Sequence, residues 1–80
     1  MNRIHVQYYA VLREQAGMSD ETLTSAAATP ADLYRELQAR HRFALAPALL
    51  RVAVNDEFCE WDRPLSAGDR VVFIPPVAGG

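Results

Sequence analysis

Thr29-Pro30-Ala31-Asp32-Leu33-Tyr34-Arg35-Glu36-Leu37 is the stretch that decides the fold, because it begins the one clear helix of this 80-residue sequence. Thr29 is typical of a helix N-cap, and the proline after it suits the first helical turn. Asp32 places a negative charge near the positive end of the helix dipole. We therefore predict a helix that begins at Thr29-Pro30.

One face of this helix is apolar. Leu33, Leu37 and His41 recur every fourth residue, with Tyr34 beside them, so that one stripe faces a core. We expect the helix to end near His41 or Arg42, because Pro47 cannot continue it.

The sequence before the helix predicts a β-hairpin. Residues 4–10 alternate in polarity, with Ile4, Val6 and Tyr8 on one face of a strand. Residues 11–17 predict a short helical turn that ends at a glycine, and residues 21–24 predict a second, weaker strand.

The sequence after the helix predicts three more strands. Residues 50–54 and 58–61 flank Asn55-Asp56-Glu57, which favours a hairpin turn. Residues 70–74 are β-branched and aromatic and predict the last strand, which Pro75-Pro76 must end because proline has no N–H to donate.

The predicted order is therefore β-β-α-β-β-β. We expect an α+β protein with the β-grasp, or ubiquitin-like, fold: a mixed sheet of about five strands with one main helix packed on one face. The length allows one domain only, which we assign to residues 1–74, followed by an extended tail at residues 75–80.

Composition excludes several classes of protein. The net charge of −2 argues against nucleic acid as a partner, and a single Cys rules out an internal disulfide framework. The N-terminus does not resemble a secretory signal, and no apolar run is long enough to cross a bilayer. We expect a cytoplasmic protein with no membrane partner.

The residues do not form a convincing enzyme site. His5 and His41 lie on different predicted elements, and no metal ligands accompany them. Cys59 lies within a predicted strand, where a small buried hydrophobic residue is the simpler interpretation. The acidic residues around the predicted hairpin of residues 50–61 are typical of solvated charges that discourage pairing at a sheet edge: Asp56, Glu57, Glu60 and Asp62. We expect no bound cofactor and no metal.

The C-terminal segment Pro75-Pro76-Val77-Ala78-Gly79-Gly80 is the informative feature. Two prolines favour an extended exit from the domain, and two glycines without side chains fit a narrow channel. Such a tail suits the delivery of a C-terminal carboxylate into another protein. Because a carboxylate is a poor electrophile, a partner must activate it, most simply by adenylation with ATP. The activated Gly80 then takes sulfur or an amine.

Residues 62–80 resemble the C-terminal signature of the small subunit of molybdopterin synthase, the MoaD family of sulfur carriers. The shared pattern is Pro-Leu, Gly-Asp, then Phe-x-Pro-Pro-Val-x-Gly-Gly, which matches Pro64-Leu65, Gly68-Asp69 and residues 73–80. Residues 6–14 also resemble the family's first strand, with the aromatic pair Tyr8-Tyr9 followed by Leu-Arg-Glu.

This resemblance implies a route. A ubiquitin-activating-like adenylyltransferase adenylates Gly80 with ATP, and the product becomes a thiocarboxylate. The large synthase subunit takes in the tail, and two carrier turnovers supply the sulfurs of the molybdopterin dithiolene. The chain would then be a non-catalytic sulfur donor in a heterotetramer whose active site lies on the large subunit, with Gly79 and Gly80 at the reacting end.

Strand alternation also predicts a docking surface. If the apolar stripes face the helix, Tyr9, Phe58 and Ile74 lie together on the open face of the sheet, near the start of the tail. The resemblance implies that hydrophobic residues at these positions contact the large subunit. We assign the interface to these three residues and to Pro75, Pro76, Val77 and Ala78; the alternative is that one or two of the three are isolated surface hydrophobics.

Other functions use the same tail. The chain could be a protein modifier joined to lysines through Gly80, a sulfur carrier for another pathway such as thiamine synthesis, or a binding module with a mobile tail. All eight basic residues are Arg, so no lysine of this chain can accept a second copy. That absence weakens a ubiquitin-like chain of self-linked copies but leaves other targets open.

Overall fold

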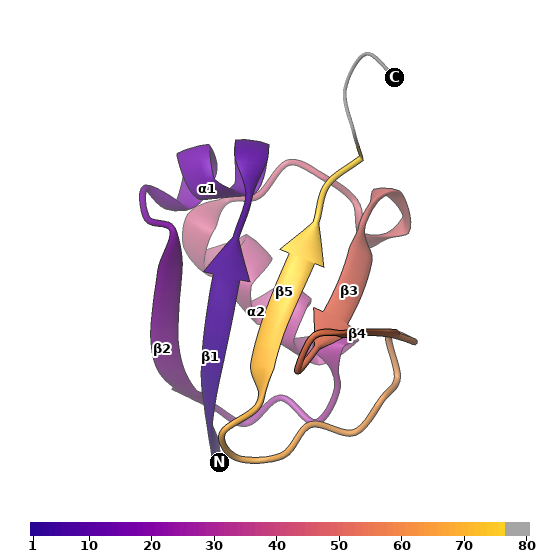
Figure 1. Ribbon diagram of the computed structural model, residues 1–80. Helices are drawn as coiled ribbons and strands as arrows, with labels where there is room; N and C mark the ends of the chain where they lie inside the picture. The colour runs from indigo at the N-terminus through magenta and orange to yellow at the C-terminus, as the bar shows by residue number, and fades with distance from the viewer. Residues whose placement is uncertain (77–80) are drawn as a thin grey trace.

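The computed structural model describes residues 1–76 and confirms the β-grasp architecture (Figure 1). Five strands form one mixed sheet in the order β2-β1-β5-β3-β4. β1 and β5 are parallel at the centre of the sheet, and the other neighbouring pairs are antiparallel. The strands are β1 (Asn2–Tyr8), β2 (Asp20–Ser25), β3 (Arg51–Val54), β4 (Glu57–Cys59) and β5 (Arg70–Ile74).

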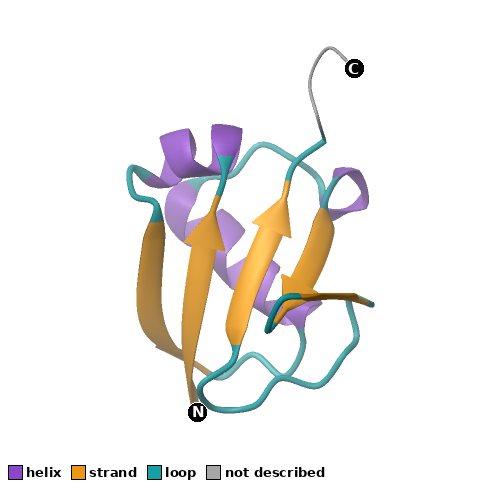
Figure 2. Ribbon diagram, viewed as in Figure 1, coloured by secondary structure: helices purple, strands orange, loops and turns teal. Residues whose placement is uncertain are grey.

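The main helix, α2 (Pro30–His41), crosses behind one face of the sheet and leaves the other face open (Figure 2). Its start is as predicted, because the hydroxyl oxygen of Thr29 accepts a hydrogen bond from the Asp32 N–H at 3.3 Å. The helix ends at Arg42, which takes a left-handed conformation with φ of 58°. Leu33, Tyr34 and Leu37 are buried against the sheet.

The first two strands pair as predicted, but the first strand ends earlier than predicted. β1 begins at Asn2 and stops at Tyr8, so the prediction that it reaches Ala10 was wrong. Ala10 has a φ of 50°, which ends the extended run, and it begins the short helix α1 (Ala10–Ala16). Gly17 closes that helix in the left-handed region, as predicted.

The second hairpin turns in two residues rather than three. Asn55 and Asp56 both have positive φ, which is the geometry of a two-residue turn between twisted strands, and Glu57 already belongs to β4. β4 stops at Cys59, so the predicted extension to Trp61 was wrong. Trp61 leaves the sheet and stacks on Phe73 with ring centroids 5.8 Å apart.

The link from β4 to β5 is held by the buried carboxylate of Asp69. It accepts hydrogen bonds from the Asn55 amide at 2.9 Å and from the Ser66 N–H at 2.8 Å. Gly68 supplies a φ of 87°, and Leu65 is buried in the core. The Pro-Leu…Gly-Asp pattern is therefore a structural device that sets the start of β5.

The core lies between α2 and the inner face of the sheet. Its members are apolar residues of the strands, of both helices and of the connecting segments: Ile4, Val6, Tyr8, Leu12, Leu23, Ala27, Leu33, Tyr34, Leu37, Phe43, Leu50, Val52, Val54, Leu65, Val71 and Phe73. A short 3-10 helix, η1 (Pro47–Leu49), leads into β3 and was not predicted. Within residues 1–76, no helix has the length and apolar character needed to cross a bilayer.

Candidate functional site

The root of the C-terminal segment lies at one end of the sheet. β5 ends at Ile74, as predicted, beside the end of its parallel neighbour β1 and far from the N-terminus (Figure 1). Pro75 is buried against the domain and Pro76 is exposed. The exposed part of the segment therefore begins at Pro76 rather than at Pro75.

The predicted reacting end lies beyond this point. Val77, Ala78, Gly79 and Gly80 are outside the residues that the structure describes, so their roles stay predictions.

The open face of the sheet presents the three predicted hydrophobic residues. Phe58 is 60% exposed and Tyr9 is 45% exposed, while Ile74 is half-buried. Cross-strand pairing joins Phe58 to Ala53 of β3, and Ala53 to Val72 of β5. Since Val71 and Phe73 are fully buried on the inner face, the alternation places Val72 and Ile74 on the open face.

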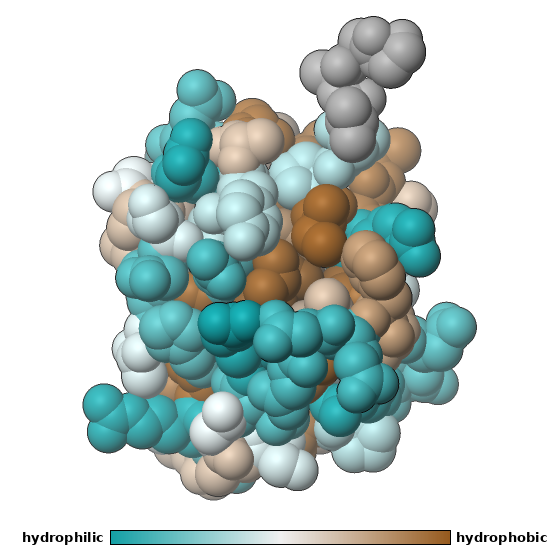
Figure 3. All heavy atoms as spheres, viewed as in Figure 1, coloured by the Kyte–Doolittle hydropathy of each residue, from teal (hydrophilic) through white to brown (hydrophobic). Residues whose placement is uncertain are grey.

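These residues contribute to a local hydrophobic surface. Figure 3 shows it over the half of the open face nearest the end of β5, whereas hydrophilic residues cover the half nearest the N-terminus. The apolar surface therefore lies next to the root of the segment that carries Gly80.

A shallow groove runs along this surface, and one of its members was missed by the sequence analysis. Its walls come from η1, β3, β4 and the end of β5: Ala48, Leu49, Leu50, Arg51, Phe58, Ile74, Pro75 and Pro76. Leu49 is 57% exposed, although it is a large apolar side chain. The proline in Pro47-Ala48-Leu49 indicated a break in the chain, but no local pattern placed Leu49 beside Pro76. Tyr9 lies at the same end of the sheet without lining the groove.

The residues that could have formed an enzyme site do not come together. Within residues 1–76 no group of three or more His, Cys, Asp or Glu side chains could hold a metal. Cys59 is half-buried, and burial raises the pKa of its thiol, which disfavours the nucleophilic thiolate. The acidic residues of the second hairpin are exposed, as predicted for an edge strand. The exposed apolar surface is therefore the candidate functional feature of the described residues.

Comparison with known proteins identifies the family. The model of the ThiS family matches residues 6–80, which is nearly the whole chain. The chain belongs to the ThiS family. The match includes the last strand and the Gly-Gly end, so the terminal pattern is part of the family resemblance.

Two individual relatives have more specific names than the ThiS family as a whole. The molybdopterin synthase sulfur carrier subunit of Escherichia coli (strain K12) is 37% identical over 96% of this chain and 99% of its own length. A putative molybdopterin converting factor, subunit 1, from Pyrococcus furiosus is 29% identical, with a TM-score of 0.78, and covers 96% of this chain and 100% of its own.

Similarity of fold alone extends to proteins with less similar sequences. Small archaeal modifier protein 1 of Haloferax volcanii has a TM-score of 0.79 at 23% identity and covers 96% of this chain and 100% of its own. At that identity the likeness shows the fold only, so the fold by itself does not separate a carrier from a modifier.

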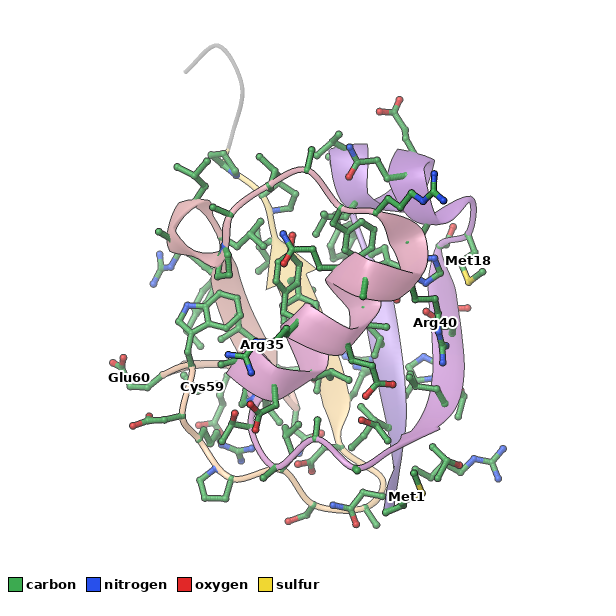
Figure 4. All side chains as sticks on the ribbon, turned by 180° about the vertical axis from the view of Figure 1, so that it is seen from behind. Met1, Met18, Arg35, Arg40, Cys59 and Glu60 are labelled. Carbon is green, nitrogen blue, oxygen red and sulfur yellow. The ribbon has the colours of Figure 1, made fainter. Side chains whose placement is uncertain are left out.

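This ThiS-family chain also contains a buried polar cluster that the sequence did not reveal. The Glu21 carboxylate of β2 accepts a hydrogen bond from the Tyr8 hydroxyl at 2.5 Å and lies 2.7 Å from His41 Nε2. Arg40 is 3.5 Å from its other oxygen, and Figure 4 shows Arg40 reaching from α2 towards β2. His41 therefore contacts Glu21, a partner that only the fold brings near.

Ionisation in this cluster follows from its surroundings. Burial, with the hydrogen bond to Glu21, raises the pKa of the Tyr8 hydroxyl far above its ordinary value. Burial works to raise the pKa of Glu21, but the hydrogen bonds from Tyr8 and His41 outweigh it and hold that pKa below its usual range. Glu21 is thus a carboxylate at neutral pH and fastens α2 to the edge of the sheet.

Proposed function

We propose that this chain is the sulfur carrier subunit of a molybdopterin synthase. The observation that supports this function best is the 37% identity to the Escherichia coli subunit over nearly the full length of both proteins. The chain's own residues agree with it, because β5 ends beside an exposed apolar surface and is followed in the sequence by Pro75-Pro76 and Gly79-Gly80.

The proposed chemistry takes place at the carboxyl carbon of Gly80. An adenylyltransferase partner transfers AMP from ATP to the Gly80 carboxylate and releases pyrophosphate. Sulfur at the oxidation level of sulfide then displaces AMP and leaves a thiocarboxylate. When that sulfur passes to the pterin precursor, water restores the carboxylate, so each cycle exchanges one oxygen for one sulfur.

In this scheme the partners bind the folded domain, and the chemistry takes place at Gly80. The domain consumes no cofactor of its own, and ATP is used by the activating partner. Both of these relatives are subunits of a larger enzyme by name, which supports a larger synthase subunit as the partner that receives Gly80 and holds the active site. A heterotetramer of two small and two large subunits, located in the cytoplasm, completes the proposal.

Mass spectrometry of the intact protein from its own cells tests this function. We expect a fraction heavier by the exchange of one oxygen for sulfur at Gly80. Deleting Gly80 should abolish sulfur transfer and leave the melting temperature unchanged, because Gly80 lies six residues beyond the end of β5 at Ile74. Only the carboxylate form, in sulfur-replete cells that are making the cofactor, would argue against the proposal.

The alternative functions predict different results. A protein modifier would appear as Gly80 joined to lysines of other proteins. A carrier for another pathway would bear the thiocarboxylate but fail to support molybdopterin formation with the larger synthase subunit. A simple binding module would keep its function after Gly79 and Gly80 are both replaced by valine.

A further inference from the structure

Arg51 stacks on Phe58 on the open face of the sheet. Its guanidinium carbon lies 4.2 Å from the centroid of the Phe58 ring, and both side chains are exposed. A guanidinium stacked on an aromatic ring is attracted by the ring's electron-rich face and is partly fixed in orientation. The Arg51 cation is thus exposed to solvent while it lies on the apolar Phe58 ring.

This cation has no acidic partner within residues 1–76. Four other arginines form ion pairs there with carboxylates: Arg35 with Asp32, Arg40 with Glu21, Arg63 with Asp69, and Arg70 with Asp56. Apart from Arg51, the groove that also contains Leu49 and Pro76 is lined by apolar side chains. Glu60 lines a neighbouring pocket that shares Arg51 and Phe58, but it forms no ion pair with Arg51. A carboxylate from another molecule can therefore reach Arg51 without displacing an internal partner.

Leu49 lines the same groove. It belongs to η1, is 57% exposed, and shares the lining with Ile74 and Pro76. The groove therefore offers an apolar depression with one fixed cation at its rim. This combination suits a protein segment in which an aliphatic or aromatic side chain lies next to an Asp or Glu.

We propose that Leu49 and Arg51 are specificity-determining residues for the larger synthase subunit, which inserts an apolar side chain into the groove and pairs an adjacent carboxylate with Arg51. This inference rests on the proposed function and deepens it, because it names the chemistry by which the partner is recognised.

The position of the groove argues for this occupant. Pro76 lines the groove, and Gly80 follows only four residues later in the sequence, so a protein that receives Gly80 comes close enough to contact the groove. A second copy of this chain is a poor occupant, since an interface between two copies of the groove would contain two Arg51 cations and no acidic groove side chain. Apolar and aromatic side chains with an arginine are also the residue types that are enriched at protein–protein interfaces.

Binding of the full-length chain to the purified larger subunit of the same organism tests this inference. Calorimetry at low and high salt compares the wild type with Arg51→Gln and Leu49→Ser. We expect each substitution to weaken binding about tenfold. Only Arg51→Gln should also flatten the dependence on salt, because it removes a charge pair that salt screens.

Two control variants match these changes elsewhere on the surface. Arg35→Gln removes an exposed arginine from the outer side of α2, and Met18→Ser removes an exposed apolar side chain near the start of β2; Figure 4 labels both residues. Both should bind the larger subunit like the wild type. All four variants should melt like the wild type, since each altered side chain is exposed.

The outcomes separate the two proposals. If the wild type binds and both test variants bind equally well, the inference about Leu49 and Arg51 is overturned while the proposed function stands. If the wild type does not bind the larger subunit, the proposed partner fails and the inference fails with it. The substitutions could instead weaken only the binding of this chain to the activating enzyme, or abolish a dimer of this chain. In either case the groove has a different occupant and the inference is wrong.

Discussion

His41 Nε2 lies 2.7 Å from Glu21 Oε1 and so joins the last turn of α2 to the edge strand β2. Both side chains are largely buried, with 10% and 15% of their surfaces exposed. The rings of Tyr8 and Phe43 enclose the histidine, with centroids 5.7 and 5.3 Å from its own. The contact is therefore shielded from water and should contribute measurably to stability.

Replacing Glu21 by Gln should lower the free energy of unfolding by about 2 kcal/mol at neutral pH, because charge-assisted hydrogen bonds are lost. The pKa of Glu21 is held low in the folded state, so its stabilisation is present above the unfolded carboxyl pKa and disappears as pH falls through the folded value. Urea unfolding across this acid range should show the variant and wild type converging.

The exposed carboxylate of Asp62 supplies the control for this pH effect. Asp62→Asn should change stability little at any pH. A difference between Glu21→Gln and wild type that stays constant into acid would contradict the role given to the Glu21 charge.

The loop before β5 should depend on the charge and geometry of Asp69. In Asp69→Asn, an amide group would face either the Asn55 amide or the Ser66 N–H, both of which are donors. We expect a loss of about 2 kcal/mol. Hydrogen exchange should quicken at the Arg70 N–H, which donates to Asn55 at 3.0 Å. Unchanged exchange at Arg70, with Glu60→Gln as the surface control, would show that the loop holds without Asp69.

One substitution should stabilise the protein. Arg42 ends α2 with a φ of 58° and ψ of 45°, a left-handed conformation that suits glycine better than a residue with a Cβ. Arg42→Gly should raise the free energy of unfolding by about 0.5 to 1 kcal/mol, measured by urea titration. Ala39→Gly, inside the same helix, should lower it by about 1 kcal/mol. Equal destabilisation by both changes would contradict this account of the helix end.

Substitutions of Phe58 and of Phe73 should affect different properties: the first should affect partner binding, and the second should affect stability. Phe58 is 60% exposed whereas Phe73 is fully buried. Phe58→Ser should change the free energy of unfolding by less than about 1 kcal/mol yet weaken binding to the larger synthase subunit at least about tenfold. Phe73→Ala should destabilise the fold by about 3 to 5 kcal/mol. Normal binding of Phe58→Ser would remove the open face from the interface.

Strong local signals account for the parts of the fold that could be predicted. The start of α2 follows from Thr29-Pro30, and the end of β5 follows from Pro75, because each depends on residues adjacent in the chain. The strand ends at Tyr8 and Cys59 were misplaced, since they depend on a backbone reversal at Ala10 and on the packing of Trp61 against the core.

The sequence by itself determined the element order, the inward faces of the first and last strands, and the apolar residues Tyr9, Phe58 and Ile74 on the other face. These follow from the two-residue period of a strand and the four-residue recurrence of a helix. Tertiary structure alone decided the Glu21–His41 contact and the groove between Leu49 and Pro76. Both join segments far apart in the chain, and only the packing of α2 and the pairing of β3 with β5 bring them within reach.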